Sequence, residues 1–347
     1  MCSDVKAFGV TAAGEEVFAV TLRNEVLTCE ILTFGAALRS LYVPDGTGMT
    51  RDVVLGYDTL AEYETLDGYL GATVGRYANR IANGCFKIHD RAYPVAQNDG
   101  KNHLHGGRVG FSHRVWKIEA VSSNQVCLSL VSGHMDEGYP GKLNVQVTYS
   151  LHQNALAIHY HAVSDADTIC NLTNHSYFNL AGHSGGHVYD QEIMLHAQAY
   201  TPTDACSIPT GQIAPVENTP MDLRQFRRMD PRLSDDFRQL KQAGGYDHNY
   251  VVDGQIGTLR SAAIARCAAS GVAMQVDTTL PGIQFYTANY LQAGRSGKGG
   301  CTYGPRHGFC LETQFFPDSP NQPAFPAALL KAGEVFDHKT VFSFSVL

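Results

Sequence analysis

The sequence is poor in charge and has no long apolar run. Only 17% of its 347 residues are charged, whereas 44% are hydrophobic, so the chain has material for a large core and little sign of disorder. No window approaches the 18 consecutive apolar residues of a membrane-spanning helix. Acidic residues outnumber basic ones, 33 to 26, which argues against a nucleic-acid-binding protein.

The nine cysteines are scattered, and no two of them form a CxxC pair. This pattern predicts neither a disulfide framework nor a zinc ribbon. The first ten residues, MCSDVKAFGV, lack the basic start and the apolar run of a secretory signal peptide. We therefore expect free thiols and a cytoplasmic location.

Signatures of cofactor chemistry are also missing. The sequence has no GxxxxGK[ST] phosphate loop, and no cluster of cysteines and histidines has the spacing of a zinc site. These absences favour acid–base chemistry without a metal or another cofactor, acting on a neutral polar substrate.

Short alternating apolar runs recur along almost the whole chain. They are rich in Val, Ile, Thr, Tyr and Phe and are separated by Gly, Pro, Asn or Asp, a pattern typical of β-strands. The clearest runs lie at residues 17–24, 26–34, 126–133, 143–151, 155–163, 273–280 and 341–347. Helical periodicity is scarce, and the two best candidates are short, at about 59–65 and 232–243.

This order of elements determines the expected fold class. Strands follow strands without the regular helix alternation of a βαβ fold, which indicates antiparallel sheets stacked as a sandwich or closed as a barrel. The 34 glycines and 14 prolines suit the many turns of such a fold. The sequence therefore predicts an all-β fold with few short helices. We assign residues 1–347 to one domain, although the length alone would allow two.

Six segments are too polar or too rich in glycine for plain strands. They are GRYANRIANG (75–84), NHLHGG (102–107), TNHSYFNLAG (173–182), GGYDHNYVV (244–252), PGIQFYTANYL (281–291) and FCLETQFFPDSPNQPAFP (309–326). The last segment places Glu312 in an apolar and aromatic run, where a carboxylate is costly to bury unless it is hydrogen-bonded or functional. A raised pKa there would suit a general base near neutral pH.

Other polar residues in these segments have structural alternatives. Arg80 could simply pair with a carboxylate on a strand, and Asp247 could cap the turn that follows two glycines. His175 could be a proton carrier, a metal ligand or a core residue with satisfied hydrogen bonds.

Two pairs of histidines have the HxH spacing. His103 and His105 could hold a metal, but no acid follows them as in a cupin-type site, so packing or polar contacts are the commoner outcome. His159 and His161 lie in a strand without a nearby turn or carboxylate, and we expect them on a sheet face.

Taken together and in order, the six segments resemble the motifs of the galactose mutarotase (aldose 1-epimerase) family, from about residue 30 to the C-terminus. The resemblance implies a large antiparallel β-sandwich of the galactose mutarotase type, with a sugar site lined by one sheet. It also implies interconversion of the α and β anomers of galactose, and usually of glucose and other aldoses, without a cofactor. We expect a small aldohexose as substrate, no nucleic-acid or membrane partner, and a monomer or homodimer.

The resemblance also implies roles for single residues. Glu312 in LETQF resembles the general base, and His175 in TNHSYFNL resembles the general acid. The implied sugar-binding set is Asn79, Arg80, His105, Asp247 and Gln284, with Tyr177 as a weaker lining candidate. Asn174, Ser176 and Asn179 become candidates for holding the ring of His175. No metal ligand is implied, and His103 and the first thirty residues have no assigned role.

Three other functions fit parts of the pattern. A glycoside hydrolase needs two carboxyl groups beside the scissile bond, which Glu312 and Asp247 could supply. A non-catalytic sugar-binding relative would be expected to have lost Glu312 or His175, and both are present. An epimerase of hexose 6-phosphates would need a cluster of arginines, but beyond Arg76 and Arg80 the motifs supply little positive charge.

Overall fold

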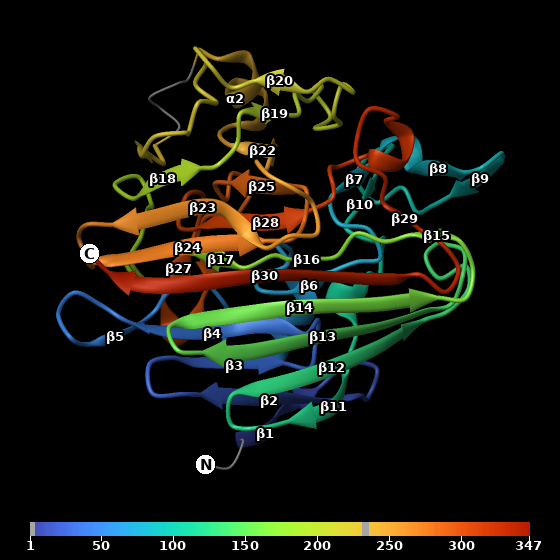
Figure 1. Cartoon of the computed structure of the whole chain (residues 1–347). Helices are drawn as coiled ribbons and strands as arrows, with labels where there is room; N and C mark the ends of the chain where they lie inside the picture. Colours follow the sequence, from blue (N-terminus) through green and yellow to red (C-terminus); the bar gives the residue numbers. More distant parts are fainter. Residues whose placement is uncertain (1–3, 231–235) are drawn as a thin grey trace.

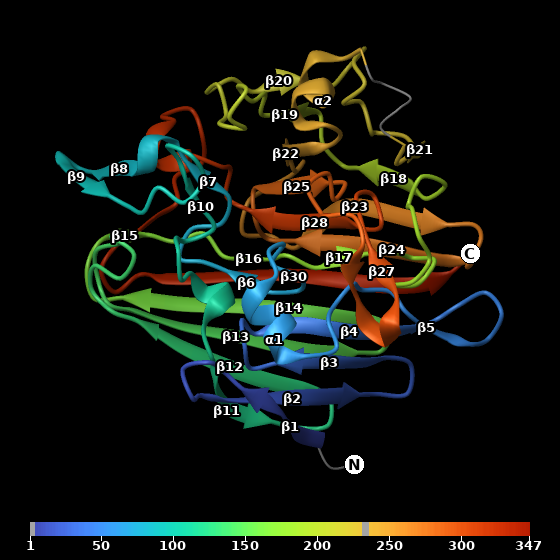
Figure 2. The ribbon, with the colours of Figure 1, turned by 180° about the vertical axis from the view of Figure 1, so that it is seen from behind.

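The computed structural model describes residues 4–230 and 236–347 (Figures 1 and 2). Within them the chain is mostly β-strand, with two short α-helices, α1 (Leu60–Thr65) and α2 (Arg238–Ala243). Helix α1 lies in the first segment with predicted helical periodicity, and Thr59 and Glu62 form a capping box at its start. The second predicted helix begins partly outside the described residues, and α2 forms its latter half.

The largest sheet has nine antiparallel strands and crosses the whole molecule (Figure 1). Its order is β11 (Lys117–Val121), β12 (Gln125–Ser132), β13 (Leu143–His152), β14 (Ala155–Ser164), β30 (Val335–Val346), β24 (Val272–Thr278), β23 (Arg260–Cys267), β18 (Glu192–Leu195) and β21 (Arg227–Arg228). Strand β30 begins six residues before the predicted start. Its first half carries exposed polar side chains such as Asp337, and these hid the apolar alternation from which the strand was predicted.

Two further sheets complete the sandwich. One has five strands, β1 (Asp4–Val10), β2 (Glu16–Arg23), β3 (Thr28–Leu32), β4 (Ala37–Pro44) and β5 (Thr50–Asp52). The other has six, β17 (Tyr177–Phe178), β28 (Phe309–Gln314), β25 (Gly282–Tyr286), β22 (Asp247–Val251), β19 (Ala199–Tyr200) and β20 (Ala214–Pro215). An isolated bridge between Val54 and Phe178 links these two sheets.

Short strand pairs join the loops around this framework. They are β6 (Thr73–Val74) with β16 (Thr173–Asn174), β7 (Arg80–Ile81) with β10 (His103–Leu104), β8 (Cys85–Ile88) with β9 (Arg91–Pro94), β15 (Thr168–Ile169) with β29 (Leu329–Leu330), and β26 (Arg295–Ser296) with β27 (Thr302–Tyr303). Single 3-10 turns lie at Ala82–Gly84, Phe111–His113, Lys298–Gly300 and Ser319–Asn321.

One apolar core lies between the nine-stranded sheet and the other two sheets. It contains Ile31 of β3, Val147 of β13, Phe342 of β30 and Phe285 of β25 among many others. All three sheets contribute to this same cluster. Every pairing between named strands that the structure describes is antiparallel, and the all-β sandwich predicted from the sequence is confirmed.

Strand β28 has both of its faces buried. Phe309 and Leu311 belong to the sandwich core, and the hydroxyl of Thr313 lies 2.5 Å from that of Thr340 in the nine-stranded sheet. Because side chains alternate along a strand, Cys310 and Glu312 point to the opposite face. That face carries the cavity described below.

No helix in the described ranges is long and apolar enough to cross a membrane. Every cysteine that the structure describes is a free thiol, as expected from the absence of paired spacing in the sequence.

Candidate active site

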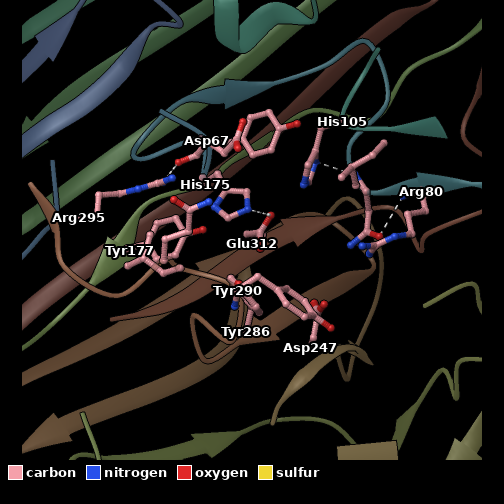
Figure 3. Close-up of a pocket in the computed structure, with 16 residues that line it drawn as sticks. Asp67, Arg80, His105, His175, Tyr177, Asp247, Tyr286, Tyr290, Arg295 and Glu312 are labelled. Atoms are coloured by element: carbon pink, nitrogen blue, oxygen red, sulfur yellow. Dashed lines mark hydrogen bonds and ion pairs between the residues drawn. The ribbon is translucent and has the colours of Figure 1, made fainter. Parts of the chain in front are cut away.

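A cavity of about 280 Å³ opens on the outer face of the six-stranded sheet (Figure 3). This volume is near the lower end of small-ligand pockets and suits one sugar ring. The cavity is lined by all but one of the predicted site residues, namely Asn79, Arg80, His105, His175, Tyr177, Asp247 and Glu312. Residues far apart in the sequence thus meet at one place.

The register of the sheet explains why these residues meet. Glu312 of β28 pairs with Gln284 of β25, and Cys310 pairs with both Tyr286 of β25 and Tyr177 of β17. Directly opposite residues share a face of the sheet, so this alternation aligns the polar side chains toward the cavity.

Glu312 lies at the base of the cavity and is only 2% exposed. Its Oε2 receives no hydrogen bond from the described residues. Burial, reinforced by the nearby negative charge of Asp247 and only partly opposed by Arg80, raises the pKa of Glu312 well above its ordinary value. The carboxylate is therefore a stronger base than one in water.

His175 projects from the turn between β16 and β17, and its Nε2 lies 3.7 Å from Oε2 of Glu312. The ring is stacked between Tyr177 and Tyr69, at centroid distances of 5.0 and 5.8 Å. Burial lowers the pKa of His175 to about 4, so its protonated form is a stronger acid than free imidazolium. Burial thus makes the imidazolium form of His175 a stronger acid and the carboxylate form of Glu312 a stronger base.

His105 occupies the opposite wall, and its ring points toward Glu312 (Figure 3). The backbone N–H of Asn79 donates to Nδ1 of His105 over 3.2 Å. Burial, together with the neighbouring His175 and Arg80, lowers the pKa of His105 well below its usual range. Its neutral ring therefore carries its proton on Nε2, because Nδ1 acts as an acceptor.

This tautomer bears on whether the site suits a metal. The ligand atoms of His105, His175 and Glu312 lie within 4.8 Å of one another, as in a two-histidine, one-carboxylate site. A metal-bound nitrogen must be unprotonated, but the Nε2 of His105 carries the proton. The three groups do not fit a cation, whereas N–H donors beside a carboxylate acceptor fit a ligand rich in hydroxyl groups.

Arg80 and Asp247 form the far end of the cavity. The Nε of Arg80 donates to Asp99 over 2.7 Å, so this arginine both pairs with a carboxylate, as the structural alternative proposed, and lines the cavity. Asp247 begins β22 and accepts a hydrogen bond of 2.7 Å from Nε2 of Gln284. Burial raises the pKa of Asp247, although the charge of Arg80 and this hydrogen bond act against the rise.

Gln284 is the one predicted site residue that is not part of the lining. Its amide nitrogen donates to Asp247, and its amide oxygen accepts from Gln314 over 3.2 Å. Both ends of the amide are therefore occupied by protein. Gln284 orients Asp247 from behind the cavity wall.

The polar neighbours of His175 do not hold its ring. Asn174 donates to the backbone oxygen of Gly71 and accepts from the hydroxyl of Ser176, and Asn179 donates to backbone oxygens of Gly186 and His307. These bonds brace the backbone of the turn. The prediction that they contact the imidazole is not supported.

Two histidines of the HxH pairs, His103 and His159, lie outside the cavity and have structural partners. His103 is fully buried, and its two ring nitrogens lie 2.7 Å from the backbone oxygen of Ala96 and 2.5 Å from the hydroxyl of Tyr139. It is a core histidine, and it does not form a metal pair with His105. His159 lies on the outer sheet face, 2.8 Å from Asp337, as predicted.

Several lining residues were not identified from the sequence. They include Asp67, Tyr69, Tyr286, Tyr290 and Arg295. Tyr286 and Tyr290 lie within one of the six polar segments, and its aromatic content was a signal for them. Asp67 and Tyr69 lie in a loop and Arg295 in the short strand β26, all without a distinctive sequence pattern, and only folding brings them to the cavity.

Comparisons with known proteins identify the family of the chain. Residues 19–343 match the family model described as aldose 1-epimerase. The chain is 45% identical to galactose mutarotase from Bos taurus over 94% of this chain and 93% of that protein. It is 43% identical to galactose mutarotase from Homo sapiens over 96% of both chains, and 34% identical to aldose 1-epimerase from Escherichia coli over 95% of this chain and 96% of that protein.

Solved structures show the same similarity. An aldose epimerase homologue from C. elegans matches with a TM-score of 0.85 at 30% identity, covering 95% of this chain and 99% of that one. Galactose 1-epimerase from Lactobacillus acidophilus matches with a TM-score of 0.86 at 26% identity, covering 99% and 98%. The fold type, the family and the isomerase class predicted from the sequence are thereby confirmed: the chain belongs to the aldose 1-epimerase family.

Proposed function

We propose that the protein interconverts the α and β anomers of galactose and glucose, with Glu312 as general base and His175 as general acid. The observation that carries this assignment is the buried pair itself. Nε2 of His175 and Oε2 of Glu312 lie 3.7 Å apart at the base of a cavity that suits one sugar ring. An acid and a base this close can act on neighbouring oxygens of a single ring.

The chemistry requires two proton transfers. Glu312 removes the proton from the hydroxyl at C1 while His175 delivers a proton from Nε2 to the ring oxygen, and the ring opens to the aldehyde. Rotation about the C1–C2 bond then presents the other face of the carbonyl. On closure His175 recovers the proton from the former ring oxygen, and Glu312 returns its proton to the oxygen at C1. Each transfer contributes on the order of 10²–10⁴-fold.

The remaining walls supply recognition. Asp247 accepts from sugar hydroxyls, while Arg80, Asn79 and the Nε2–H of His105 donate to them. Tyr177, which stacks on His175, excludes water from the acid. A small cavity with both hydrogen-bond donors and acceptors matches the hydroxyl groups of a sugar, which donate and accept hydrogen bonds.

The proposal is tested by polarimetry. Freshly dissolved α-galactose and α-glucose are each mixed with the purified protein, and the change in optical rotation is compared with the spontaneous rate. The expected result is strong acceleration with the native protein and almost none with Glu312→Gln. Equal rates with and without the native protein would refute the proposal.

A parallel assay separates the hydrolytic alternative. Nitrophenyl galactosides are incubated with the protein, and no nitrophenol release is expected. Release without accelerated mutarotation would identify a glycoside hydrolase that uses Glu312 and Asp247.

We also propose a cytoplasmic location and a monomeric or homodimeric state. The free thiols of the described cysteines suit a reducing compartment. Cell fractionation and size-exclusion chromatography with light scattering test these two points.

A further inference from the structure

The side chain of Cys310 contacts the ring nitrogen of His175 that faces away from Glu312. Its Sγ lies 3.6 Å from Nδ1 of His175, and Cys310 is fully buried. An interaction with its own backbone acts to raise the pKa of His175, and the backbone carbonyl of His175 accepts from the backbone N–H of Gly71 over 3.0 Å. The thiol sulfur is the side-chain partner of Nδ1.

The proposed reaction makes this contact chemically important. A neutral imidazole is far too weak an acid to protonate a sugar, so the acid must be the imidazolium form of His175. When Nε2 gives up its proton, the neutral ring must keep its other proton on Nδ1. If that proton moved to Nε2 instead, Nε2 could not take a proton back when the ring closes. An acceptor beside Nδ1 is therefore required in both charge states.

Resting on the proposed roles of His175 and Glu312, we propose that Cys310 is a positioning residue whose sulfur accepts the Nδ1–H of His175 and so fixes the tautomer that exchanges protons at Nε2. Cys310 does not touch the sugar. It acts only through the imidazole, from a position two residues before the base on the same strand.

A thiol suits this position better than a carboxylate. Burial, with the nearby charges of Glu312 and Asp247, raises the pKa of Cys310 well above its ordinary value, so the group stays neutral. A neutral sulfur is a weak acceptor, and it orients the ring without stabilising the imidazolium as strongly as an aspartate would. His175 therefore remains a strong acid.

Other ionisable groups around the ring make different contacts. They are Glu312 of β28 on the Nε2 side, His105 after β10 at a centroid distance of 5.3 Å, Tyr177 of β17 and Tyr69 on the two ring faces, and Tyr286 of β25 at the edge. Cys310 is the side chain among them that contacts Nδ1.

The test compares Cys310→Ala, Cys310→Ser and Cys29→Ala. Cys29 of β3 is an equally buried thiol in the apolar core between the sheets. Its truncation therefore controls for a general loss of packing. We expect Cys310→Ala to lower kcat roughly 5- to 10-fold, as for one lost hydrogen bond, with KM within about 2-fold. The alkaline limb of kcat shifts to lower pH, because the imidazolium loses an acceptor. Cys310→Ser retains an acceptor and recovers most of kcat.

A second measurement does not depend on turnover. The ¹⁵N resonances of histidine-labelled protein distinguish protonated from unprotonated ring nitrogens, and His175→Asn identifies the resonances of interest. We expect the neutral ring of His175 to carry its proton on Nδ1 in the native protein. In Cys310→Ala the ring should lose this preference.

Two results would overturn the inference: a native ring protonated on Nε2, or a Cys310→Ala variant whose kcat and pH profile equal those of Cys29→Ala. Failure of the proposed function would look different, since the native protein itself would then show no accelerated mutarotation.

Discussion

Replacing Glu312 by glutamine should abolish activity and at the same time stabilise the protein. The carboxylate is buried at the base of the cavity, and its Oε2 has no hydrogen-bond donor among the described residues. Asp247 adds a nearby negative charge. The native fold therefore makes ionisation of this carboxyl group unfavourable, a cost that a neutral amide of the same shape does not carry.

The size of the effect follows from the cost of a buried, unsatisfied polar group. We expect Glu312→Gln to raise the free energy of unfolding by about 1–3 kcal/mol at neutral pH and to lower kcat by about 10²–10⁴-fold. The stability gain depends on pH. Because the pKa of Glu312 is higher in the folded protein than in the unfolded chain, the native enzyme keeps its full stability below the ordinary carboxyl pKa and loses it as the pH rises through the folded pKa.

Urea denaturation at several values between about pH 4 and pH 8 measures this difference. The gap between variant and native protein should be small at the acid end and widest at the alkaline end. Glu16→Gln, an exposed site on β2, provides a matched control for which little change is expected. A variant that is less stable than the native enzyme at the alkaline end, or one that keeps normal kcat, would refute the reasoning.

Three other substitutions test separate parts of the structure. His175→Asn should lower kcat by about 10²–10⁴-fold with a small change in KM; in steady-state polarimetry, a large rise in KM at unchanged kcat would make His175 a binding residue instead. Asp247→Asn should raise KM for galactose about 10-fold or more through loss of a charged hydrogen-bond partner, and a purely kcat effect would contradict that role. Lys298→Met should cost about 3–5 kcal/mol in urea denaturation, because it leaves Asp52 buried without the 2.6 Å ion pair, whereas stability equal to that of exposed Lys331→Met would show that the pair contributes little.

The strand pattern was predictable because alternation is a local property. Each predicted run overlaps an observed strand, and the largest difference is the start of β30, six residues early. This agreement arises because a half-buried strand must place its apolar residues at every second position. The pairing order was not predictable. Strand β30 lies between β14 and β24, and no local feature of the sequence specifies neighbours so distant along the chain.

The proposed catalytic pair could be identified from the sequence. Glu312 stood out as a carboxylate in an apolar run, and the resemblance to a family implied His175 as its partner. Contacts made across strands were not accessible. Gln284 and Cys310 reveal their partners only through the register of β25 and β28, where Gln284 approaches Asp247 and Cys310 approaches His175.

The aromatic residues around His175 limit where its ring can exchange protons. Tyr69 and Tyr177 cover the two faces of the imidazole. The ring therefore exchanges protons with the cavity through the edge that bears Nε2. In the proposed complex, a sugar in the cavity covers this edge. In the proposed cycle His175 recovers from the former ring oxygen the proton that it gave to it. Glu312 likewise returns to the oxygen at C1 the proton that it removed. The enzyme thus ends each turnover in its starting ionisation state, with no step that waits for solvent.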